Sequence, residues 1–154
     1  MPQGIAIDHA PAELPVHAAA QPADLRVPLE GLLAAITTTG AARAATLRVH
    51  DEPTGGLRLL GAAQVPRDFM QRLTVMEDGC GACGEATHTH REVCREEACK
   101  CARAISAEPA QQGLVRVIPL THGDRACGVL TLFGCADRDG HADLFAMLPA
   151  LGEL

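Results

Sequence analysis

The chain has no tryptophan or tyrosine and only three phenylalanines among 154 residues. Its 13 basic residues are outnumbered by 19 acidic ones, which gives a formal net charge of -6. Proteins that bind nucleic acid cluster Lys and Arg along the phosphates and often stack bases on aromatic rings. We therefore expect no nucleic-acid partner, and we expect a core built mainly from Ala, Leu and Val.

Long apolar runs are also missing. No segment approaches the ~20 apolar residues that span a bilayer, and the N-terminus lacks the basic and apolar regions of a signal peptide. We expect no membrane association and a cytoplasmic location. Seven cysteines are nevertheless present. In a reducing compartment, such a density indicates metal binding or thiol chemistry rather than a disulfide framework.

The length fits one domain. Residues 1–22 mix Pro, Ala, Gln and His without an apolar period, which predicts a flexible tail before a domain at 23–154. Residues 23–38 have the apolar spacing of an amphipathic helix, with Pro28 as an alternative start.

Further elements follow from alternating apolar residues and turn signals. In chain order they are strands at 45–50 and 57–62, a helix at 66–72, an irregular segment at 78–112, strands at 114–120 and 126–133, and a helix at 142–151. Two more short strands fit near 74–76 and 92–94. Strands joined by hairpins favour an α/β (α+β) fold with a central antiparallel sheet flanked by N- and C-terminal helices.

Five short motifs resemble the GAF family in their order and spacing. They are ATLRV at 45–49, LRLLG at 57–61, CGEA at 83–86, VIPL at 117–120 and GVLTL at 128–132. The nearest resemblance is to the cysteine-containing GAF regions of bacterial nitrate/nitrite-type sensor histidine kinases. It implies a six-stranded sheet with a ligand pocket on one face, and signal perception rather than catalysis.

The resemblance also implies partners. The chain shows no kinase core, receiver or DNA-binding segment, so we expect it to relay to a separate sensor kinase or regulator. GAF domains commonly dimerise through their terminal helices, here residues 28–38 and 142–151, so a homodimer is also expected.

A cysteine cluster is the main candidate site. Its members are Cys80, Cys83, Cys94, Cys99 and Cys101. Thiolates suit zinc, copper(I) and iron-sulfur clusters, and a C-x2-C turn lets two sulfurs meet at one metal. The spacing matches neither a standard zinc finger nor a ferredoxin, so a zinc or iron ion, an iron-sulfur cluster and a metal-free redox switch all stay open. Ordinary buried cysteines are the remaining interpretation.

Other candidates are weaker. His88 and His90 form an H-x-H pair whose rings point apart on a helix or strand, so they are secondary metal ligands. Cys127 is expected to be a buried structural thiol, because both faces of its strand are apolar. Cys135 follows the end of that strand, and His122 is expected to be a solvated turn residue.

We expect a stand-alone cytosolic sensor and not an enzyme. One alternative is a thiol-dependent enzyme like the free methionine-(R)-sulfoxide reductases of the GAF family, in which Cys83 would match the first cysteine and Cys94, Cys99 or Cys101 its partner. That branch cradles its substrate with aromatic residues, which are scarce here. A metal-free GAF domain that binds a small molecule or anion is the third interpretation.

Overall fold

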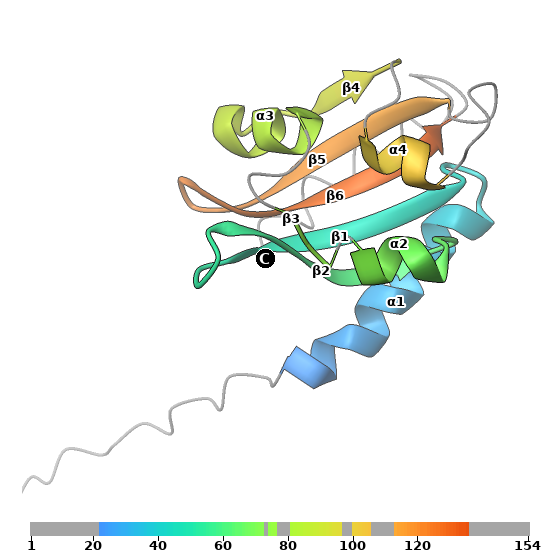
Figure 1. Ribbon diagram of the computed structural model, residues 1–154, viewed down its shortest axis with the longest axis horizontal. Helices are drawn as coiled ribbons and strands as arrows, with labels where there is room; N and C mark the ends of the chain where they lie inside the picture. Colours follow the sequence, from blue (N-terminus) through green and yellow to red (C-terminus); the bar gives the residue numbers. More distant parts are fainter. Residues whose placement is uncertain (1–21, 73, 77–80, 97–99, 106–112, 136–154) are drawn as a thin grey trace, which may run out of the picture.

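The computed structural model describes residues 22–72, 74–76, 81–96, 100–105 and 113–135. Its helices and strands are labelled in Figure 1. In chain order they are α1 (Pro22–Thr38), β1 (Ala44–Asp51), β2 (Gly56–Ala63), α2 (Arg67–Arg72), β3 (Val75–Met76), α3 (Gly81–Thr89), β4 (Val93–Arg95), α4 (Lys100–Ile105), β5 (Leu114–His122) and β6 (Arg125–Cys135).

The described strands form one six-stranded sheet in the order β3-β2-β1-β6-β5-β4. Every pairing is antiparallel. The hairpins β1–β2 and β5–β6 confirm the four strands predicted with alternating apolar residues. The short edge strands β3 and β4 confirm the two extra strands expected near 74–76 and 92–94.

Helices cover both faces of the sheet. On one face, Leu33 and Ile36 of α1 pack against Leu47, Leu130 and Leu132. On the other face, α2, α3 and α4 contribute Phe69, Ala82, Cys83, Ala86, Cys101 and Ala102 to a second cluster with Val115, Val117 and Val129. Both clusters are mainly aliphatic, as the composition predicts.

Helix α1 extends over the whole segment predicted as amphipathic. Pro28 lies inside it rather than at its start. Proline has no N–H to donate, so the helix loses one backbone hydrogen bond at this turn. Burial of Leu33 and Ile36 against the sheet compensates for that loss.

The prediction of an irregular segment at 78–112 is wrong for its described part. Besides β4, the strand expected near 92–94, residues 81–96 and 100–105 contain two helices that were not predicted, α3 and α4. Ala82, Cys83 and Ala86 lie on one helical face and are buried against the sheet. Tertiary packing thus stabilises a helix that carries two glycines, at Gly81 and Gly84. The predicted tail at 1–22, apart from Pro22, and the predicted helix at 142–151 lie outside the described residues.

No helix among the described residues is long and apolar enough to cross a bilayer.

Candidate functional site

Cys83 is anchored beneath α3. It lies in the first turn of that helix with 1% of its surface exposed. Its Sγ is 3.6 Å from Oγ1 of Thr131 in β6, and either atom could donate the hydrogen. The thiol therefore joins α3 to one of the two central strands.

Cys101 reaches the same layer from α4. It is 2% exposed, and its Sγ lies 3.6 Å from the Sδ of Met76 in β3. Cys83 and Cys101 belong to one apolar cluster between the helices and the sheet. Two of the five predicted site cysteines thus share one buried layer, although different helices carry them.

Cys94 lies on a different side of the sheet. Its neighbour Val93 packs in the layer of Cys83, so the alternation of β4 directs Cys94 to the α1 face. Cys135 packs on that face with the core of α1. Burial raises the pKa of the Cys135 thiol to about 11, Arg116 opposes the rise, and Cys94 contributes to it as a nearby charge.

Metal binding by the cysteine segment depends on residues outside the described part. Among all the residues that the structure describes, no three His, Cys, Asp or Glu side chains are placed to hold one metal ion. Cys80 and Cys99 are not described. The convergence of the five cysteines therefore stays a prediction, and a four-thiol site would need both Cys80 and Cys99.

Buried polar groups lie near Cys83 on the same face of the sheet. Thr46 pairs with Thr131 across β1 and β6, and both are buried. Arg48, two residues along β1, is 1% exposed, and its Nη1 donates to the Leu57 carbonyl at 3.2 Å. Burying a guanidinium costs several kcal/mol unless it is well compensated. Sequence reasoning treated Arg48 only as part of the ATLRV motif, because the sequence does not show that helices cover both faces of β1.

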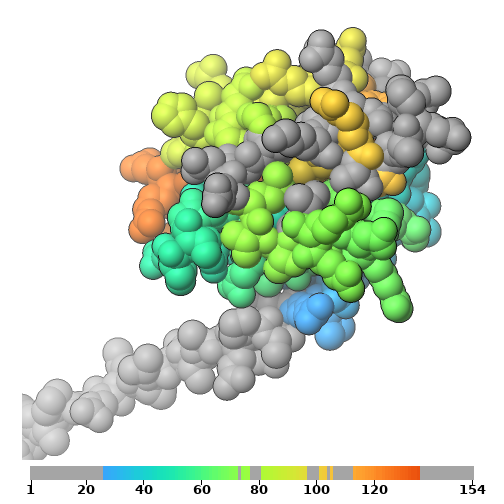
Figure 2. All heavy atoms as spheres, viewed as in Figure 1, coloured from blue at the N-terminus to red at the C-terminus, as the bar shows by residue number. Residues whose placement is uncertain are grey.

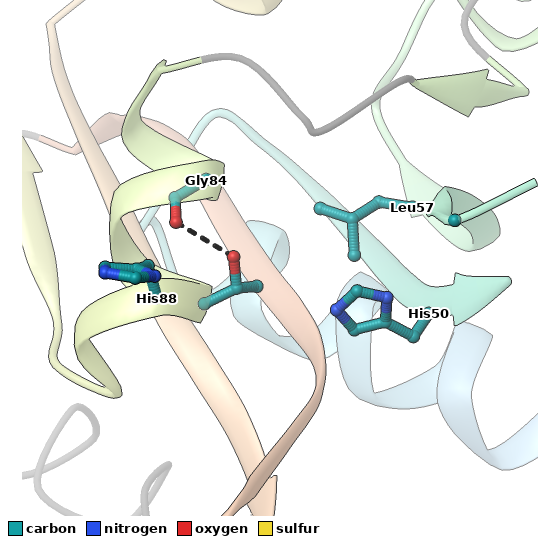
Figure 3. Close-up of a pocket in the computed structure, with 6 residues that line it drawn as sticks. His50, Leu57, Gly84 and His88 are labelled. Carbon is teal, nitrogen blue, oxygen red and sulfur yellow. Dashed lines mark hydrogen bonds between the residues drawn. The ribbon is translucent and has the colours of Figure 1, made fainter. Parts of the chain in front are cut away.

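Two neighbouring pockets open at one end of this face. The smaller has a volume of about 320 Å³ and is lined by His50, Gly55, Leu57, Gly84, Thr87 and His88. In Figure 3, His88 on α3 lies across this pocket from His50 and Leu57, and Thr87 Oγ1 donates to the Gly84 carbonyl at 2.9 Å.

The larger pocket, here called the hairpin pocket, has a volume of about 600 Å³. It is lined by His50, Glu52, Thr87, His90, His122, Asp124, Arg125, Ala126 and Cys127. Figure 2 shows the β1–β2 hairpin (teal) and the β5–β6 hairpin (orange) side by side below α3. The two pockets share His50 and Thr87.

All four histidines of the described residues line these pockets. His50 ends β1, His88 lies in α3, His90 follows α3, and His122 ends β5. Sequence reasoning did not consider His50, and it treated His122 as a solvated turn residue. Only the pairing of the two hairpins with α3 brings them together, so no local pattern could have indicated the grouping.

His90 also has an unusual backbone. Its φ of 55° lies in the left-handed region, which non-glycine residues seldom adopt. His90 thus occupies the position after α3 where a left-handed residue ends the helix, and it is one of the residues that line the hairpin pocket.

The prediction that Cys127 is a buried structural thiol is wrong, because Cys127 is exposed. The β5–β6 register shifts between Leu120 and Thr121, so that Leu120 faces Gly128 and Thr121 faces Ala126. Cys127 is the extra residue of this bulge. Bulges re-aim side chains, and here the thiol lines the hairpin pocket instead of the core.

No protein-family model matches the chain, and no curated protein matches its sequence. Several solved structures are similar in fold. The GAF domain of a phosphoenolpyruvate-protein phosphotransferase from Coxiella burnetii superposes with a TM-score of 0.64 at 16% identity, over 88% of this chain and 82% of that one. Free methionine-R-sulfoxide reductase from Neisseria meningitidis gives 0.65 at 19% identity, over 83% and 75%.

A third similar structure is the NreA protein of Staphylococcus aureus, mutated in its nitrate-binding site. Its TM-score is 0.55 at 13% identity, over 75% of this chain and 89% of that one. These similarities concern the fold, and both enzymes and sensor domains share it. The sheet order, the helices on both faces and these superpositions together show that the chain adopts the GAF fold.

Proposed function

We propose that this chain is a signal-sensing GAF-type domain whose cysteines between Cys80 and Cys101 bind a metal ion or an iron-sulfur cluster, or switch by reversible oxidation. The observation that carries the proposal is the burial of Cys83 and Cys101 in one layer between sheet and helices. A change in the bonding of either sulfur would act directly on the packing of α3 and α4.

Helix α3 offers a path from the thiols to the pockets. Cys83 lies near its start, and Thr87 and His88 near its end line the pockets. Packed interiors are dense and transmit small displacements. If α3 can adopt two positions on the sheet, a signal that binds or reacts more favourably with the domain in one of them would raise the population of that state.

The best donor set for a single metal is Cys80, Cys83, Cys99 and Cys101. Cys80 directly precedes α3 and Cys99 directly precedes α4, so each is close in sequence to a cysteine of the shared layer. Four thiolates complete a tetrahedral zinc or iron site or hold an iron-sulfur cluster. Cys94 is the least suitable member, because it faces the α1 side of the sheet.

Elemental analysis and a visible spectrum of anaerobically purified protein test the proposal. We expect bound zinc or iron, and we expect serine at Cys80, Cys83, Cys99 or Cys101 to release it, because losing one ligand opens the site. Cys127→Ser is the control and should retain the metal. A protein free of zinc, iron and copper, whose thiols neither pair nor react on mild oxidation, would favour metal-free small-molecule binding instead.

We further propose that the signal passes to a second copy of the chain or to a separate kinase or regulator, through the exposed side of α1. Arg26, Val27 and Glu30 are exposed there. Light scattering and pull-down experiments test this, and a monomer that recovers no partner would contradict it.

The second candidate function is thiol-dependent reduction of free methionine-(R)-sulfoxide. Reductases from Neisseria meningitidis and Thermoplasma acidophilum share the fold. The Cys83 thiolate would take the sulfoxide oxygen to become a sulfenic acid and release methionine. A second thiol would then condense with it, releasing water and forming a disulfide that an external dithiol reduces. Against this stands the chain's lack of Trp and Tyr.

Turnover of free methionine-(R)-sulfoxide with a dithiol reductant separates the two candidates. The sensor proposal expects no turnover above that of the Cys83→Ser variant. Sustained turnover that this substitution abolishes would favour the enzyme.

A further inference from the structure

The sulfur atoms of Met76 and Cys101 meet where the end of β3 contacts the first turn of α4. Cys101 Sγ lies 3.6 Å from Met76 Sδ. We propose that this pair is a copper(I) site, to which the Cys101 thiolate and the Met76 thioether each donate one sulfur. Cys101 is shared with the cysteine site proposed above, but the pair needs none of the other thiols of that site.

The two donors suit copper(I) better than zinc. Thiolate and thioether sulfurs are soft ligands that select copper(I). Copper(I) is also stable with only two sulfur ligands, whereas a protein zinc site takes four donors. In the part of the chain that the structure describes, no three His, Cys, Asp or Glu side chains surround one ion. The described sulfurs therefore fit an ion that needs only two ligands.

The surroundings suit an ion of single charge. Cys101 is buried and Met76 is half-buried, and both pack in the apolar cluster between the helices and the sheet. The thiol releases its proton on binding, so a copper(I) ion on one thiolate carries no net charge. A zinc ion on the same pair would leave a net positive charge, and a buried charge is costly.

The pair can open enough to hold the ion. Two metal–sulfur bonds of about 2.3 Å span at most about 4.6 Å, so the sulfurs need to part by no more than about 1 Å. Met76 has a flexible side chain with three rotatable bonds, and it lies in a two-residue strand at the edge of the sheet. Its thioether can therefore move without disturbing the central strands.

Copper(I) titrated anaerobically into the reduced full chain, in competition with a chromogenic copper(I) chelator, tests the site. We expect Met76→Leu to weaken the tightest copper(I) binding at least about tenfold, because even residues that only support metal ligands contribute that much. Leucine keeps the volume of methionine and is well tolerated in its place. The same substitution should leave the zinc affinity unchanged, since zinc takes thiolate but not thioether ligands.

Met70→Leu is the matched control, because Met70 lies in α2 with 36% of its surface exposed. It should leave the copper(I) affinity unchanged. In NMR spectra of the methionine methyl groups, the Met76 signal should shift with the first equivalent of copper(I), and the Met70 signal should not. An unchanged copper(I) affinity in Met76→Leu would overturn the proposal. Equal losses of copper(I) and zinc affinity would also overturn it, because they would show that Met76 only packs.

The copper(I) pair and the cysteine site fail independently. Cys80→Ser and Cys99→Ser should release zinc or iron from the cysteine site and retain the copper(I) binding that depends on Met76. Binding of copper(I) through Met76, in a chain that holds no zinc or iron, would overturn only the proposed metal site of the cysteine segment.

Discussion

The Sγ of Cys83 and the Oγ1 of Thr131 lie 3.6 Å apart in the buried layer beneath α3. This contact connects the helix that carries the pocket residues to β6 at the centre of the sheet. We expect Cys83→Ala to lower the free energy of unfolding by about 1 kcal/mol, because it leaves a small cavity and removes a partner of Thr131.

Urea denaturation measures this effect, and Cys127→Ala is the control. An exposed side chain should change stability by less than about 0.5 kcal/mol. Equal effects of the two substitutions would show that Cys83 is not packed as described.

Thiol reactivity should follow exposure. We expect Cys127 to be alkylated first among the described cysteines, because Cys83, Cys101 and Cys135 are buried and Cys94 is half-buried. Mass spectrometry after brief alkylation at pH 8 measures the order. Faster labelling of Cys83 than of Cys127 in native protein would contradict the burial of α3 on the sheet.

Because the pKa of the buried Cys135 thiol is raised, we expect the domain to lose stability at alkaline pH. The pKa of this thiol rises from 9.0 to about 11 on folding, chiefly through burial. As pH rises above 9 the unfolded chain loses this proton first, so the folded state loses relative stability until pH reaches about 11. Below pH 9 the thiol is protonated in both states and contributes no pH dependence.

Denaturation of wild type and Cys135→Ala between pH 7 and 11 isolates the effect. The six other cysteines and the single lysine also titrate in this range, but both proteins carry them, so the difference between the two proteins isolates Cys135. The stability difference between the two proteins should shrink or reverse above pH 9. Parallel curves would show that the thiol is not buried.

Gly128 should be hard to replace. A Cβ at this position would lie 2.2 Å from the Arg48 carbonyl oxygen on the neighbouring strand. Because both atoms belong to the two central strands, we expect Gly128→Ala to destabilise the domain by about 2–3 kcal/mol.

Gly31 in α1 is the matched control. A Cβ there meets nothing within 4 Å, so Gly31→Ala should stabilise the domain by about 0.5–1 kcal/mol through its better helix propensity. Thermal melts of the two variants should move in opposite directions. Similar shifts would contradict the close approach of β1 and β6.

The sheet could be predicted because β1, β2, β5 and β6 carry their own local signals. Alternating apolar residues indicate the strands, and turn residues such as Gly123, whose φ is 58°, mark the hairpins. Helices α3 and α4 were missed because they are short and depend on packing against the sheet. Their buried residues are alanine and cysteine, which differ too little in hydrophobicity from their small neighbours to give a clear helical period.

The site was predictable only in part. Spacing drew attention to Cys83 and Cys101, and the fold brings both into one layer. The same spacing could not show that β4 turns Cys94 to the other face, or that a bulge exposes Cys127. The grouping of His50, His90 and His122 depends on two hairpins and a helix end that are far apart in the sequence.

The central claim is that the cysteine segment senses a signal by changing the packing of α3 and α4. Amide hydrogen exchange in these two helices tests this claim most directly. Anaerobically purified protein would be compared with the same protein after a metal chelator and after mild peroxide oxidation. The proposal predicts that one treatment speeds or slows amide exchange in Gly81–Thr89 and Lys100–Ile105, while β1 and β6 keep their protection. Unchanged exchange in both helices after both treatments, in a protein shown to be metal-free, would contradict it.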